Sequence, residues 1–113
     1  MKLNKSILLI PILLVLVFFL IGCLPVPVTG VTILQDDFFQ IVLGGTPFQL
    51  TIEIEPSNAS DTGVTWTSSN TVSATVDGNG LVTAVEKGMA KITVTTNDGG
   101  FTDTVEIEVI ELK

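Results

Sequence analysis

Histidine, tyrosine and arginine are absent from this chain of 113 residues, and cysteine and tryptophan each occur once. Without histidine, and with a single thiol, the chain lacks the paired nucleophile and base of most covalent catalysts. Without arginine or clustered lysines, it has no basic stripe that would neutralise phosphates. A lone cysteine excludes an internal disulfide. These absences predict a non-catalytic protein that uses no cofactor and binds no nucleic acid.

The one cysteine, Cys23, closes an apolar run near the amino terminus. Lys2 and Lys5 supply a positive start, and fifteen residues without a charge follow from Ile7 to Ile21. A membrane-spanning helix needs roughly 20 apolar residues. Two prolines also follow the run closely and discourage helical extension. A cleaved targeting segment therefore fits better than a retained membrane helix, which stays the alternative.

The end of this run, Leu20-Ile21-Gly22-Cys23, resembles the lipobox that bacterial lipoprotein signal peptidase cleaves. The resemblance implies that residues 1–22 are a lipoprotein signal peptide and that Cys23 is the lipidation site, carrying a diacylglyceryl thioether. Two acyl chains are enough for stable membrane anchoring. Leu24 is not the aspartate that marks inner-membrane retention in some enterobacteria. We expect a lipid-anchored protein of the bacterial cell membrane or outer membrane, with its domain outside the cytoplasm.

The remainder of the chain has the size of one small domain. We expect residues 23–30 to form the lipidated cysteine and a short proline-containing linker of about 20 Å, and residues 31–113 to form the domain. Twelve acidic residues against three lysines give this part a side-chain charge of −9. Such a charge maintains solubility; attraction of a basic partner or of divalent cations is the alternative.

Apolar and polar residues alternate along the mature chain with the period of two that is typical of half-buried strands. One predicted strand starts at Phe48 and places Leu50 and Ile54 on its inward face; the last places Phe101 and Val105 inward, with Asp103 as the one polar exception. Glycine-rich clusters predict the reversals between strands: Gly44-Gly45, Asp77-Gly78-Asn79-Gly80 and Asn97-Asp98-Gly99-Gly100. With one further strand region at 31–42, the pattern predicts an all-β, immunoglobulin-like β-sandwich of about seven to eight strands.

Six segments in this order resemble the bacterial Ig-like domain, group 2, across residues 28–109: Pro56 to Ala59, Val64 to Ser69, Ala74 to Asp77, Gly80 to Ala84, Gly88 to Val94, and Asp98-Gly99. The resemblance implies a Greek-key sandwich without the antibody-type disulfide. It departs at Ser73, where the family usually has a valine, and this predicts a shift or bulge near residues 72–74.

Several residues have both a structural and a functional interpretation. Trp66 alternates with Val64 and Ser68, which favours a core position over a sugar-stacking surface. The cluster at 77–80 favours a hairpin over a calcium loop, since the twelfth position holds glycine instead of a bidentate glutamate. A weak surface calcium site that uses Asp36, Asp37 or glutamate side chains stays open. Asn58-Ala59-Ser60 satisfies the glycosylation sequon, but a turn role for the asparagine takes precedence.

The anchor and the fold together predict a non-catalytic Ig-like lipoprotein that acts as a binding, adhesion or scaffold module of the bacterial cell envelope. Its partners would be the membrane, through the N-terminal lipid, and an envelope or surface protein or polysaccharide, held at an edge strand or at loops. The alternative is a carbohydrate- or cell-wall-binding lipoprotein that uses whichever of Phe38 and Phe39 faces outward. A third interpretation is a mechanical or accessory domain.

Overall fold

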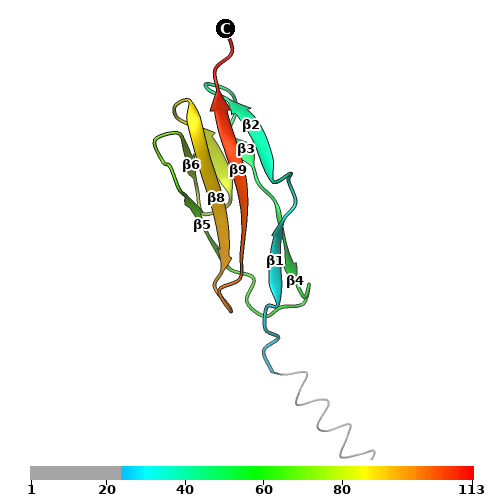
Figure 1. Ribbon diagram of the computed structural model, residues 1–113. Coiled ribbons are helices and arrows are strands. Elements are labelled where there is room, and N and C mark those ends of the chain that lie inside the picture. Colours follow the sequence, from blue (N-terminus) through cyan, green and yellow to red (C-terminus); the bar gives the residue numbers. More distant parts are fainter. Residues whose placement is uncertain (1–23) are drawn as a thin grey trace, which may run out of the picture.

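The computed structural model describes residues 24–113, which form nine β-strands and no helix (Figure 1). The predicted signal peptide and Cys23 lie outside the described residues. The predicted all-β fold class is confirmed. In chain order the strands are β1 (Gly30–Ile33), β2 (Phe38–Val42), β3 (Phe48–Gln49), β4 (Ile52–Glu55), β5 (Val64–Ser68), β6 (Ala74–Val76), β7 (Leu81–Ala84), β8 (Gly88–Thr96) and β9 (Thr102–Ile110).

Nine strands replace the predicted seven or eight because two of the predicted strands are interrupted. The region 31–42 divides into β1 and β2, and the row that starts at Phe48 divides into β3 and β4 at residues 50–51. At each break the chain changes its pairing partner. Strands β1 and β4 pair with each other, whereas β2 joins β9 and β3 joins β7. A period of two shows which side chains share a face, but it does not show where a ladder changes partner.

The strands form two layers around one core. One layer is a four-stranded sheet in the order β2-β9-β8-β5, and the other contains β3-β7-β6 together with the pair β1-β4. Strand β2 runs parallel to β9, while all other pairs among residues 24–113 are antiparallel. Strands β8 and β9 cross the length of the sandwich (Figure 1). This arrangement is the immunoglobulin-like sandwich that the sequence predicts.

The core consists of the inward faces of both layers. Val105, Ile107 and Val109 on β9 are buried, as the alternation predicts. Trp66 is 9% exposed, which confirms its core assignment. Phe101 does not belong to this row: it is 39% exposed, because β9 begins one residue later and Phe101 lies in the hairpin.

The hairpin between β6 and β7 is closed by Asp77. Its carboxylate accepts hydrogen bonds from the main-chain nitrogens of Asn79 and Leu81, at 2.8 and 2.9 Å. Gly80 supplies the positive φ of 83° that the turn requires. This confirms the hairpin, because these two hydrogen bonds close the turn between the paired strands β6 and β7.

Ser73 stands in the turn that precedes β6, and its main-chain oxygen accepts hydrogen bonds from the nitrogens of both Val85 and Glu86, at 2.8 and 3.2 Å. The side chain is buried, and its hydroxyl oxygen accepts a hydrogen bond of 3.0 Å from the amide of Asn70. Strand β6 then starts at Ala74 in regular register with Ala84. Two residues that follow β7 thus face one residue before β6, as in a β-bulge, so the predicted irregularity near residues 72–74 is found at the end of the ladder, and the register within β6 stays regular.

Residues 26–29, which belong to the predicted linker 23–30, form hydrogen bonds with the domain. The main-chain nitrogen of Val26 donates to the hydroxyl of Ser60 at 2.7 Å, and Ser60 nitrogen donates back to Val26 oxygen at 2.9 Å. Val28 is buried, and its nitrogen donates to the carboxylate of Asp98 at 3.0 Å. The packed part of the chain thus begins at Val26, at the end of the sandwich opposite the C-terminus (Figure 1).

Candidate functional site: the open edge of strand β2

Strand β2 carries the two adjacent aromatic residues that the sequence singles out. Phe38 points to the outside of the four-stranded sheet and is 49% exposed. Phe39 points the other way, and its ring lies 4.8 Å from the ring of Phe48, measured between centroids. The structure therefore identifies Phe38 as the outward member of the pair and Phe39 as a half-buried residue at the margin of the core.

Within residues 24–113, no strand pairs with the outer edge of β2. On the inner edge, Asp37 oxygen accepts from Glu106 nitrogen at 2.8 Å, and Leu43 nitrogen donates to Ile110 oxygen at 2.7 Å. Main-chain groups alternate in direction along a strand, so odd-numbered residues of β2 face β9 and even-numbered ones face away. The outward-facing set is Phe38, Gln40 and Val42, of which Val42 oxygen accepts from Gly45 nitrogen.

An open groove of about 400 Å³ lies beside this edge, where the chain leaves β1 for β2 and where β3 begins. Its apolar lining comes from Leu34, Phe39 and Phe48, of which Leu34 is 56% exposed and Phe48 is 36% exposed. The polar residues that line it are Gln35, Asp36 and Gln40. The groove continues the inward side of β2, since Phe39 belongs to both.

Both glutamines of the groove are already engaged. Gln35 donates to the hydroxyl of Thr51 at 2.8 Å, and its carbonyl accepts from Thr51 nitrogen at 2.9 Å. Gln40 donates to a carboxylate oxygen of Glu108 at 2.6 Å. Both amides thus have partners within the domain. Asp36 is the polar side chain of the groove that forms no hydrogen bond among residues 24–113.

The surroundings of the edge are acidic. Asp37 precedes β2, and the register places Glu106 beside Phe38 and Glu108 beside Gln40. A second hollow, of about 490 Å³, includes Asp37 and Glu106 and, one strand further, Lys91. The edge therefore presents an aromatic ring and an apolar groove inside a mostly negative rim.

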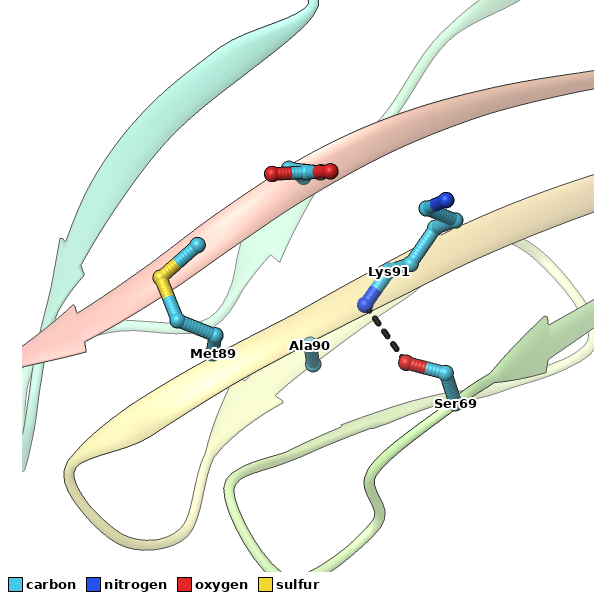
Figure 2. A pocket seen from close by; sticks show the side chains of 5 residues that line it. Ser69, Met89, Ala90 and Lys91 are labelled. Atoms are coloured by element: carbon cyan, nitrogen blue, oxygen red, sulfur yellow. Dashed lines mark hydrogen bonds between the residues drawn. The ribbon is translucent and has the colours of Figure 1, made fainter.

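The other hollows on the described part of the chain bring together fewer side chains that could contact a partner. Figure 2 shows a shallow one of about 170 Å³ on the outer face of β8, where Ser69, Met89 and Lys91 meet. The Ser69 hydroxyl accepts a hydrogen bond of 2.8 Å from Lys91 main-chain nitrogen, so it is engaged in holding the loop. A further hollow of about 290 Å³ lies near Leu43 and Lys87 and is equally open.

Among residues 24–113, no three acidic, histidine or cysteine side chains gather as a metal site would require. Asp36 and Asp37 are accordingly not joined by a third carboxylate. The same part of the chain contains no helix long and apolar enough to cross a membrane. The predicted lipidation site, Cys23, is outside the described residues.

The comparisons with known proteins agree with this fold. Over 74 residues the chain is 47% identical to the lacto-N-biosidase of Bifidobacterium bifidum, a match that covers 63% of this chain and 7% of that enzyme. It is 38% identical over 81 residues to an uncharacterized protein of Clostridium acetobutylicum, covering 71% of this chain and 20% of that protein. The chain thus spans only a small part of these relatives.

Among solved structures, domains 4 and 5 of the S-layer protein SbsC match with a TM-score of 0.56 and 23% identity. That match covers 77% of this chain and 54% of the solved one, and it supports the fold. The sequence model of the bacterial Ig-like domain (group 2) matches residues 27–107, which is most of the chain. The chain therefore belongs to the bacterial Ig-like domain (group 2) family.

Proposed function

We propose that this chain is a non-catalytic binding module of the bacterial cell envelope, tethered to the membrane through a lipid on Cys23, and that it holds its partner at the outer edge of β2. The observation that carries the binding part is the exposure of Phe38, Leu34 and Phe48 around an open strand edge. Exposed apolar clusters with a polar rim mark interaction sites on soluble domains.

The non-catalytic part is supported by composition. A chain without histidine or tyrosine, whose single cysteine carries lipid, has carboxylates and hydroxyls as its main reactive groups. Its glutamates on β4 and β9 lie on outward or solvent-facing positions of strands. Paired carboxylates at such positions do not converge on a substrate as catalytic pairs do.

The tether would be short. Two residues, Leu24 and Pro25, separate Cys23 from Val26, which is hydrogen-bonded to Ser60. The amino-terminal end of the sandwich would therefore rest close to the bilayer. Strand β2 lies in the half of the domain nearer the C-terminus (Figure 1), so its edge would lie in the half of the domain farther from the membrane. If the cell has two membranes, we place the anchor in the outer one.

Two experiments test the proposal. Labelled palmitate should be incorporated into the wild-type protein and lost from Cys23→Ala; label retained on the mutant would refute the anchor. A photo-crosslinking amino acid placed at position 38 in living cells should capture one discrete partner. The matched control is position 67 on β5, where Thr67 is also an exposed residue of an edge strand of the same sheet. Equal capture at both positions would refute the β2 edge as the site.

Protease accessibility of the domain on intact cells, with lysed cells as the control, identifies the face of the envelope. Cleavage on intact cells places the partner on another cell, a host or a matrix. Cleavage only after lysis places the partner inside the envelope. Both outcomes are compatible with the lipid anchor. The first favours adhesion, and the second favours a scaffold inside the envelope.

Carbohydrate binding is the second candidate, and the aromatic pair of Phe39 and Phe48 beside the exposed Phe38 favours it. Its weakness lies in the amides of Gln35 and Gln40, which already form hydrogen bonds within the domain and so offer fewer groups to sugar hydroxyls. Binding to a glycan array that disappears in Phe38→Ala would support this candidate over a protein partner.

A further inference from the structure

We propose that the outer edge of β2 binds an extended, positively charged peptide segment, which adds to the four-stranded sheet as a fifth strand and places one bulky apolar side chain in the groove over Phe39 and Phe48. The inference rests on the proposed function in taking the β2 edge as the binding site. It adds the chemical class of the partner and the way in which the partner is held.

The main-chain groups of β2 are arranged to receive a strand. Phe38, Gln40 and Val42 direct their N–H and C=O groups away from β9, at the regular spacing of a ladder. A peptide added to such an edge gains main-chain hydrogen bonds, and pockets for alternate side chains select its sequence. Val42 oxygen already accepts from Gly45 nitrogen, but a carbonyl has two lone pairs and can accept a second bond.

The edge of β2 also lacks the usual protection of an edge strand. Natural edge strands are usually protected from pairing with another chain, because they are very short or carry proline or charged residues. Strands β3 and β6, at the ends of the three-stranded sheet, have two and three residues. Strand β5, at the far end of the larger sheet, also has five residues with neither proline nor charge, but it exposes threonines where β2 exposes Phe38.

The groove explains where the side chains of the added strand would lie. Side chains of an added strand alternate between the outer face, beside Phe38, and the inner face, beside Phe39. The inner positions fall over the groove lined by Leu34, Phe39 and Phe48. Because the amides in the groove are already bonded to Thr51 and Glu108, an apolar side chain suits it better than a polar one.

The charge of the rim selects a basic segment. Outer-face side chains of the added strand would lie next to Phe38 and Gln40, two strand spacings, or about 10 Å, from Glu106 and Glu108. Long lysine or arginine side chains shorten that distance, and the exposed ring of Phe38 offers a cation–π contact. Asp36 and Asp37 extend the negative rim beyond the start of the strand.

The test uses the full-length protein, extracted from membranes into a neutral detergent, and blocked heptapeptides as probes. The probe KVKFKVK places lysines on one face of a strand and apolar residues on the other. EVEFEVE reverses the charge, and KPKFKPK keeps the charge but cannot form the ladder. Binding is followed by backbone chemical shifts at 10 and 150 mM salt, because screening grows over this range.

We expect KVKFKVK to bind with shifts confined to residues 34–43 and 48 and to the neighbouring part of β9. Its affinity should fall several-fold at the higher salt concentration, and each control peptide should bind at least about tenfold more weakly. Equal affinity for KVKFKVK and EVEFEVE, shifts centred elsewhere, or no binding at millimolar peptide would overturn the proposal. So would sedimentation showing that the protein pairs with itself through β2.

Variants test the strand edge and the acidic rim separately. Gln40→Pro removes an N–H that faces solvent and not β9, so it should block the edge while the fold survives. Phe38→Lys supplies a second block by charge, with Thr67→Lys as its matched control. Asp36→Asn with Asp37→Asn should weaken KVKFKVK several-fold, and Glu86→Gln with Glu111→Gln should not. If KVKFKVK fails while in-cell cross-linking from position 38 succeeds, the binding edge stands and the strand-addition proposal falls.

Discussion

The carboxylate of Asp103 accepts a hydrogen bond of 2.7 Å from the main-chain nitrogen of Ile33, seventy positions earlier in the chain. This contact accounts for the one polar residue in the inward row of β9. Ile33 is the last residue of β1, where the chain turns towards β2. The carboxylate thus holds the first strand against the last at the point where the chain passes from one layer to the other.

Replacing Asp103 with alanine should lower the free energy of unfolding by about 1–3 kcal/mol, because the main-chain donor of Ile33 loses its partner in a partly buried place. Asp103→Asn keeps an acceptor oxygen and should cost less. Urea denaturation measures both, with Glu53→Ala on an outward position of β4 as the control. Equal losses in Asp103→Ala and Glu53→Ala would show that the contact adds nothing.

Gly80 and Trp66 are in close contact, and this predicts a strong effect of a single methyl group. A Cβ at position 80 would lie 2.8 Å from Cζ2 of Trp66, and the residue has φ of +83°. Gly80→Ala should therefore lower the free energy of unfolding by more than about 1 kcal/mol. Gly78→Ala in the same turn is the matched control, since its added Cβ meets no atom within 4 Å. The comparison is made by the urea midpoint, and similar midpoints for the two variants would contradict the packing.

Trp66 fills the space between the layers, so Trp66→Ala should cost roughly 3–5 kcal/mol, much of the stability of a small domain. Circular dichroism in the far ultraviolet follows the melting without relying on indole fluorescence. An unchanged melting temperature would show that the indole is not part of the core. Thr67→Ala, at the exposed neighbouring position, should leave the melting temperature nearly unchanged.

The docking of residues 26–29 predicts a local effect on amide exchange. Ser60→Ala removes the hydroxyl that accepts from Val26 nitrogen, so exchange at Val26 should accelerate several-fold while the core strands stay protected. Ser57→Ala, an exposed change in the same loop, is the control. Slow exchange at Val26 in both variants would mean that the segment is held by other contacts.

Alternation and turn residues were sufficient to predict the all-β fold, the hairpin closed by Asp77 and the core position of Trp66. These features are local: each depends on residues within a few positions of one another. The same alternation wrongly joined Phe48 to Ile54 as one strand and placed Phe101 inside. It could not show that the chain changes partner at Leu50, because a change of partner leaves the order of polar and apolar residues unaltered.

The candidate site, like the fold, could be predicted only in part from the sequence. The sequence by itself determined that Phe38 and Phe39 face opposite sides of a strand, since adjacent side chains must do so. Only the tertiary structure decided which of them is exposed, that β2 lies at the end of its sheet, and that Asp103 and Asp98 reach back to residues 28–33. Those facts depend on hydrogen bonds between residues about seventy positions apart, and a pattern that repeats every second residue carries no information about such distant partners.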